Sequence, residues 1–235
     1  RNGERALLKA YCPECDAPIL TKEAHPYVIT LAGPVGSGKT TLALSAISAL
    51  ERHARATNPY AQQRSTSTPN AFSPPYIAGL PGCGRNGGYL AFFDISGRYF
   101  EGSQSVVGEQ PQYGSEDVIV FVVDPTARDS ALIAETAVND FWQTHHAVSQ
   151  TSLSSVIRTP LHVVVTRRDV VGGQADVRGY LERNGFAHAV SSLESSFKDV
   201  GYHICDARDE HEAAAVLAEV FRSVEPSVSS EFGKA

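Results

Sequence analysis

The sequence lacks any apolar run close to the roughly 20 residues that a helix needs to cross a bilayer. It also lacks a block of like charge, because its 20 basic and 26 acidic side chains are spread along the chain and give a formal net charge of −6. These two absences argue against a membrane span, and against nucleic acid or an anionic membrane as a general partner. No basic segment followed by an apolar one opens the sequence, so nothing indicates secretion and we expect a cytoplasmic protein.

Cysteine is also scarce, and the four residues are Cys12, Cys15, Cys83 and Cys205. Only Cys12 and Cys15, within YCPECDAP, have the Cys-x-x-Cys spacing that lets two thiolates bind one zinc ion from a tight turn. A tetrahedral zinc site needs two further ligands, and no second pair follows at the spacing of a zinc ribbon. Two interpretations stay open: half of a zinc site, which Cys83 or residues outside this sequence would complete, or two reduced cysteines.

The composition is that of a globular chain, with 42% hydrophobic and 20% charged residues among 235 positions. Apolar strand patterns alternate with helix patterns, an order typical of a mostly parallel sheet with helices on both faces. The segments YIAGL and GYLAFFD flank the glycine-rich PGCGRNGG, as two antiparallel strands do. We therefore predict an α/β fold whose six-stranded sheet is mostly parallel, with one antiparallel strand. The main strand patterns lie at 27–33, 117–124 and 161–166, and the helix patterns at 39–54, 131–147, 181–197 and 210–224. The predicted domains are an N-terminal Cys-x-x-Cys extension (1–24), the α/β domain (25–225) and a polar tail (226–235).

A complete phosphate-loop motif lies between a predicted strand and a predicted helix. GPVGSGKT, residues 33–40, matches G-x-x-x-x-G-K-[ST] at every fixed position. Its glycines let backbone N–H groups converge on an anion, and the following helix adds the positive end of its dipole. Lys39 would contact the terminal phosphates, and the hydroxyl of Thr40 would coordinate Mg²⁺. The predicted nucleotide-binding residues of this loop are Gly33, Val35, Gly36, Ser37, Gly38, Lys39, Thr40 and Thr41.

A second motif follows the predicted antiparallel pair of strands. FFDISG places Asp94 at a strand end and Gly97 three residues later. Asp94 could hold Mg²⁺ through water, and the N–H of Gly97 could approach a γ-phosphate because glycine has no side chain. Asp-x-x-Gly is a weak pattern alone, and its place downstream of a phosphate loop strengthens it.

Four motifs in this order make residues 27–223 resemble a P-loop GTPase of the translation-factor-like (TRAFAC) class. They are GPVGSGKT (33–40), DISG (94–97), TRRD (166–169) and CDA (205–207). The resemblance implies a Ras-like fold with helices on both faces of the sheet, bound GTP or GDP, and Mg²⁺. It also assigns catalytic roles to Lys39, Thr40, Asp94 and Gly97, and Arg98, which follows Gly97, is a further candidate catalytic residue.

The resemblance implies that TRRD reads guanine. In the family this strand ends in Asn/Thr-Lys-x-Asp, and the aspartate accepts hydrogen bonds from guanine N1–H and N2–H. Asp169 and Thr166 match that pattern, whereas Arg167 replaces the lysine, with a planar guanidinium that can also stack on a purine. Ala207 would offer its N–H to guanine O6. Adenine offers no matching pair of donors, so a buried carboxylate would lose its partners.

Two departures from the family predict slow hydrolysis. Ras-like members have a glutamine after Asp-x-x-Gly to orient the attacking water, and this sequence has Arg98. They have glycine where this sequence has Val35, whose side chain crowds the same space. Positioning and charge stabilisation supply most of the catalysis of phosphoryl transfer. We therefore expect a GTP-binding switch that hydrolyses GTP slowly and regulates an effector protein; a pseudo-GTPase module and an ATP-using P-loop enzyme are the alternatives.

Two long polar loops would be the switch regions of such a protein. The first, 55–75, would supply a threonine to Mg²⁺, with Thr68 the first choice and Thr66 the second. The second, 95–115, is rich in glycine, which suits an order–disorder change. Within the class, CPEC, GPVGSGKTT, YLAFFDISG and VVDP are similar to the double-GTPase domains of bacterial conflict systems. Such a resemblance allows a dimer that depends on nucleotide.

Overall fold

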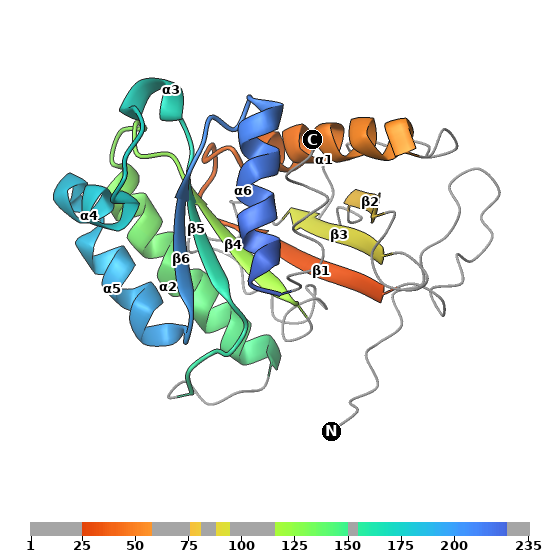
Figure 1. Cartoon of the computed structure of the whole chain (residues 1–235). Helices are drawn as coiled ribbons and strands as arrows, with labels where there is room; N and C mark the ends of the chain where they lie inside the picture. Colours follow the sequence, from red (N-terminus) through yellow and green to blue (C-terminus); the bar gives the residue numbers. More distant parts are fainter. Residues whose placement is uncertain (1–24, 58–75, 81–87, 95–115, 150–154, 225–235) are drawn as a thin grey trace.

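The computed structural model describes residues 25–57, 76–80, 88–94, 116–149 and 155–224 of the chain (Figure 1). The predicted extension (1–24) and tail (226–235) lie outside these residues, as do Cys12, Cys15, Thr68, Gly97 and Arg98. In the described part, no helix combines the length and hydropathy that a membrane crossing requires.

The described strands form one sheet in the order β2-β3-β1-β4-β5-β6. Five neighbouring strands from β3 to β6 run parallel, and β2 pairs antiparallel with β3 at one edge. The prediction of an α/β fold with a parallel sheet is confirmed, and the arrangement is consistent with the Ras-like fold that the resemblance implies. The strands are β1 (His25–Ala32), β2 (Tyr76–Leu80), β3 (Gly88–Asp94), β4 (Val118–Val123), β5 (Leu161–Val165) and β6 (Val200–Ile204).

Helices cover both faces of the sheet (Figure 1). On one face α1 and α6 pack together, and on the other lie α2, α4 and α5. The helical elements are α1 (Lys39–Thr57), α2 (Ser130–Ser149), α3 (Arg168–Val171), α4 (Val177–Leu181), the π-helical turn η2 (Glu182–Phe186), α5 (Ala187–Ser196) and α6 (Glu210–Arg222).

The central strand β4 explains why its sequence is an uninterrupted apolar run. All six of its residues are buried. Because side chains alternate along a strand, Val118, Val120 and Val122 belong to the core beneath α1 and α6. Ile119 and Phe121 belong to the second core, beneath α2 and α5. A strand with an apolar core on each side has no polar face to display.

The parallel strands bring several loops together along the carboxyl edge of the sheet, where these strands end. The carboxyl ends of β1, β3, β4, β5 and β6 lie along this edge, since the five strands share one direction. Ligands of open α/β sheets bind at such an edge. The loops that carry GPVGSGKT, TRRD and CDA, together with Asp94 at the end of β3, therefore gather in one place.

Candidate nucleotide site

The loop from β1 to α1 has a backbone that depends on glycine at Gly33. Its φ of 134° lies where side chains are rarely tolerated, and an added Cβ would overlap the carbonyl oxygen of Val122 on β4. Gly36 and Gly38 also have positive φ angles, of 76° and 93°. The chain thus turns tightly between strand and helix, and the first intrahelical hydrogen bond, from Leu42 N to Gly38 O, begins α1.

Lys39 lies inside the curve of this loop. Its side chain is 6% exposed, and Nζ donates to Gly33 O at 2.8 Å and to Pro34 O at 2.7 Å. Two carbonyl oxygens stabilise the buried ammonium and hold it across the loop. A fixed cation beside the N-terminus of α1 is what an incoming anion requires.

Thr40 joins α1 to the end of β3. Its hydroxyl donates to Oδ2 of Asp94, and the parallel pairing of Leu31 with Asp94 places that carboxylate beside the loop. Oδ1 of Asp94 is buried and has no hydrogen-bond partner within the described residues. Burial raises the pKa of Asp94, against the opposing effects of the Thr40 hydrogen bond and the Lys39 charge. A half-satisfied carboxylate beside a hydroxyl has room for a cation.

The side chains at this point fit Mg²⁺ better than a metal that is held by protein ligands alone. Among the described residues no three His, Cys, Asp or Glu side chains are grouped as a metal site. Mg²⁺ needs no such group, because it is usually held by one or two protein oxygens, phosphate oxygens and water. The Thr40 hydroxyl and the Asp94 carboxylate are hard oxygen donors of this kind.

Thr166 ties the end of β5 to the phosphate loop. Its side chain is buried, and its hydroxyl donates to Ser37 O at 2.9 Å, with Val123 O at 3.2 Å as a second acceptor. A Cβ at Gly38 would lie 3.3 Å from the Thr166 methyl group, so the two segments are in close contact. The structure therefore brings TRRD and GPVGSGKT together.

The two arginines of TRRD point to different partners. Arg167 has φ 66° and ψ 37°, an unusual left-handed conformation for a residue with a side chain. Its Nε donates to Oδ1 of Asp169 at 3.1 Å, and its Nη2 donates to Oδ2 at 3.5 Å. Arg168 instead donates from Nη1 to Oε1 of Glu212 on α6 at 3.0 Å. The carboxylate of Asp169 stays 40% exposed at the rim.

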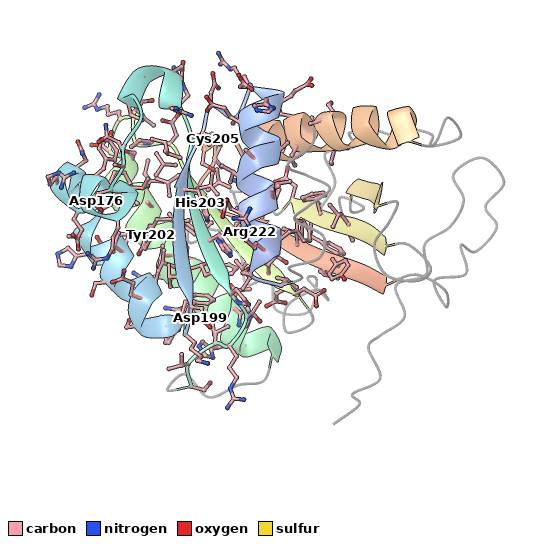
Figure 2. All side chains as sticks on the ribbon, viewed as in Figure 1. Asp176, Asp199, Tyr202, His203, Cys205 and Arg222 are labelled. Carbon is pink, nitrogen blue, oxygen red and sulfur yellow. The ribbon has the colours of Figure 1, made fainter. Side chains whose placement is uncertain are left out.

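The CDA loop after β6 lies against TRRD. Arg168 N donates to Cys205 O at 3.2 Å, and Cys205 N donates to Val165 O at 3.0 Å. Ala207 is buried in this loop. Burial raises the pKa of the Cys205 thiol to about 12, so the thiol stays protonated at neutral pH. Figure 2 shows Cys205 at the site end of β6 and Asp199 near the opposite end.

Sequence reasoning missed Glu212. Its Oε2 accepts a hydrogen bond from Asp206 N at 2.8 Å, while its Oε1 pairs with Arg168, so one side chain fixes two loops of the site. A signal was present, because Asp209 caps α6 and Glu212 follows it at the spacing of a capping box. The glutamate reaches past the cap residue to the loop before it, which the spacing alone does not reveal.

Comparisons with known proteins add little. No protein-family model matches the chain, and no curated protein matches it. Among solved structures, it is similar to a GTP-binding protein from the hyperthermophilic archaeon Sulfolobus solfataricus, in complex with GDP, with a TM-score of 0.46 and 13% sequence identity. The match covers 87% of this chain and 53% of that one, so this chain spans about half of that protein's length. So weak a likeness carries no argument about function, which has to come from the site.

Proposed function

We propose that this protein is a GTP-binding molecular switch that hydrolyses GTP slowly and regulates a partner protein. The observation that carries the proposal is the hydrogen bond from the Thr166 hydroxyl to Ser37 O. It joins a loop built to hold phosphates to a loop that ends in an exposed carboxylate. The two parts of a nucleotide would match these two loops: its anionic phosphate chain would lie in the first, and its base would lie against the second.

The phosphates would lie in the curve of residues 33–40. The backbone N–H groups of the loop and the N-terminus of α1 favour an anion there. Lys39 already has its cation inside the curve, held by Gly33 O and Pro34 O. A bound Mg²⁺ would neutralise charge that develops on the β- and γ-phosphates. Thr40 and Asp94 would hold it, with Thr68 proposed as a further ligand.

The base would lie against TRRD and CDA. Asp169 would accept hydrogen bonds from guanine N1–H and N2–H, and Ala207 N–H would donate to O6. The contact of Arg168 N with Cys205 O holds the two loops side by side, which supports this assignment. Adenine would leave the Asp169 carboxylate without its pair of donors.

Slow hydrolysis is proposed from the two departures in sequence. The Val35 side chain is 53% exposed on the phosphate loop, where it would crowd a water-orienting group. Arg98, in place of the expected glutamine, lies outside the described residues, as do the switch segments 58–75 and 95–115. An effector, a dimer that depends on nucleotide, and zinc at Cys12 and Cys15 remain predictions.

Calorimetric titration with GTP, GDP, ATP and ADP, in the presence of Mg²⁺, tests the proposal. Wild type should prefer guanine nucleotides, and Asp169→Asn should lose that preference while it still binds phosphates. Asp199→Asn, a substitution near the opposite end of β6, is the matched control and should behave as wild type (Figure 2). Equal or tighter binding of ATP would refute the assignment and favour an ATP-using enzyme.

The exposed Val35 also favours a second candidate, a nucleotide-binding module that does not hydrolyse GTP. Single-turnover hydrolysis separates the two. A rate above that of Lys39→Ala, which lacks the phosphate-loop cation, would support the switch. Equal rates in the two proteins, with GTP bound to wild type, would support the module.

A further inference from the structure

The carboxylate assigned to guanine already has a partner in its own loop. Arg167 Nε donates to Oδ1 of Asp169 at 3.1 Å, and Nη2 donates to Oδ2 at 3.5 Å. One guanidinium thus faces both oxygens of the carboxylate. The side chains are 35% and 40% exposed, so the pair lies at the rim, where a ligand can reach it.

The donors of Arg167 and those of guanine have the same pattern. A guanidinium offers two parallel N–H groups from nitrogens that share one carbon, and it meets a carboxylate bidentately. The N1–H and N2–H of guanine are also two parallel donors on nitrogens that share one carbon. The two groups therefore compete for the same edge of Asp169. A lysine ammonium, which is a point charge, has no such fork.

We propose that Arg167 is a specificity-determining residue: it occupies the guanine-reading edge of Asp169 in the free protein, and guanine must displace it to bind. The inference rests on the proposed function, because it takes Asp169 as the group that reads the base. Arg167 then lowers the affinity for guanine nucleotides selectively. It does not lower the affinity for adenine nucleotides in the same way, since adenine makes no use of that edge.

The displaced guanidinium has anionic surroundings to move into. The pKa of Arg167 is raised first by the hydrogen bond and charge of Asp169, and then by the charges of Asp124 and Asp206. Asp124 follows β4 and is anchored by Thr126 N at 2.8 Å, while Asp206 follows β6 and is anchored by Arg208 N at 2.9 Å. These two carboxylates stay in place when guanine takes Asp169, so the arginine keeps neighbours of opposite charge.

The test is the ratio of the dissociation constants for ADP and GDP, measured by displacement of a fluorescent GDP analogue in Mg²⁺. The ratio cancels the effect of a cation on the phosphates, which both nucleotides share. Arg167→Lys keeps the charge and removes the fork, and Arg167→Asn also removes the charge with a residue that tolerates positive φ. Arg168→Lys is the matched control, because the neighbouring arginine contacts Glu212 and not Asp169.

We expect the ratio to rise about two- to fivefold in both Arg167 variants, the range that an exposed ion pair supports. It should stay at the wild-type value in Arg168→Lys. A second readout is the ¹⁵N resonance of Arg167 Nε, assigned by its loss in Arg167→Lys. That resonance should shift when GDP is added, and much less with ADP.

A ratio that stays constant or falls in the Arg167 variants, with GDP bound, would overturn this inference and leave the proposed function intact. A Nε resonance that does not respond to GDP would also count against it. If neither wild type nor the variants bind GDP, the proposed function fails, and this inference fails with it. A rise in the Arg167 variants that Arg168→Lys shares would show an effect that does not depend on the contact with Asp169, and it would overturn the competition.

Discussion

Two polar clusters in this fold differ in whether their hydrogen bonds are complete. At the carboxyl edge of the sheet, Asp94 keeps a buried oxygen that has no hydrogen-bond partner within the described residues. Beneath α6, by contrast, His162 uses both ring nitrogens, with His203 at 2.8 Å and Ser223 at 2.9 Å. Figure 2 shows His203 on β6. Asp94 thus keeps an oxygen that could accept a further bond, whereas both ring nitrogens of His162 are used within the fold.

The histidine cluster has one internally consistent arrangement of protons. Ser223 donates its hydroxyl to Val220 O at 2.6 Å, so His162 Nε2 must donate to Ser223. His162 Nδ1 then accepts from His203 Nε2. The chain of bonds links β6, β5 and the end of α6. It needs a neutral His162, and burial, followed by the charge of His203, lowers the pKa of His162 to about 4.

The largest expected effect comes from Gly33→Ala. The new Cβ would overlap Val122 O and would also strain a backbone at φ 134°. We expect a loss of roughly 3 kcal/mol or more in the free energy of unfolding, because strain and overlap act together. Urea denaturation measures it. Gly36→Ala is the control, since its φ is also positive and no atom lies within 4 Å of the new Cβ. Equal losses in both variants would contradict the role of the overlap.

The next largest effect is a dependence of stability on pH, which arises from the hydrogen-bonded cluster of His162, His203 and Ser223. His162 ordinarily has a pKa of 6.5 and in the folded protein one of about 4, so the unfolded chain binds the proton more tightly. Its contribution is therefore complete above pH 6.5 and lost as the pH falls towards 4, amounting to about 3 kcal/mol. Denaturant unfolding across this range should give a flatter profile for His162→Gln than for wild type. The exposed His188→Gln should leave the profile unchanged; an unaltered slope in His162→Gln would refute the assignment.

The smallest expected effect concerns Asp94 in the candidate site. Its pH dependence of stability has the opposite sign to that of His162. Burial raises the pKa of Asp94 in the folded protein above its ordinary value of 3.8. Its contribution to the free energy of unfolding is therefore complete below pH 3.8 and is lost as the pH rises through the folded pKa. Without nucleotide and Mg²⁺, Asp94→Asn should therefore unfold at slightly higher denaturant than wild type at pH 7, and the gain should vanish in acid. Asp199→Asn should show no gain. A variant less stable than wild type at pH 7 would show that Asp94 is an ordinary structural carboxylate.

The sequence alone predicts those parts of the candidate site that a short motif or a local periodicity encodes. The strand before Gly33 and the helix after Lys39 follow from an apolar run and a helical period. Asp94 lies next to Thr40 because parallel strands end at one edge, and this also follows from the order of elements. Thr166 is found by its motif, although its contact with Ser37 required the fold.

Other features depend on tertiary structure that no local pattern encodes. The pairing of Arg167 with Asp169 needs a positive φ at a residue other than glycine. The contact of His162 with His203 depends on the register of β5 against β6, where Leu161 pairs with Val200. The helix expected within 181–197 is α5, Ala187–Ser196; Gly185, at φ 91°, interrupts the chain before it, so helical periodicity alone does not place its start.

The hydrogen bond between Thr166 and Ser37 has a consequence for how the protein would distinguish nucleotides with different numbers of phosphates. It fixes the distance between the loop of residues 166–169 and the loop of residues 33–40, so under the proposed function neither loop has to be ordered when a nucleotide binds. A nucleoside diphosphate and a triphosphate would meet the same rigid frame from the base to the second phosphate. Discrimination between them would then fall to whatever surrounds the third.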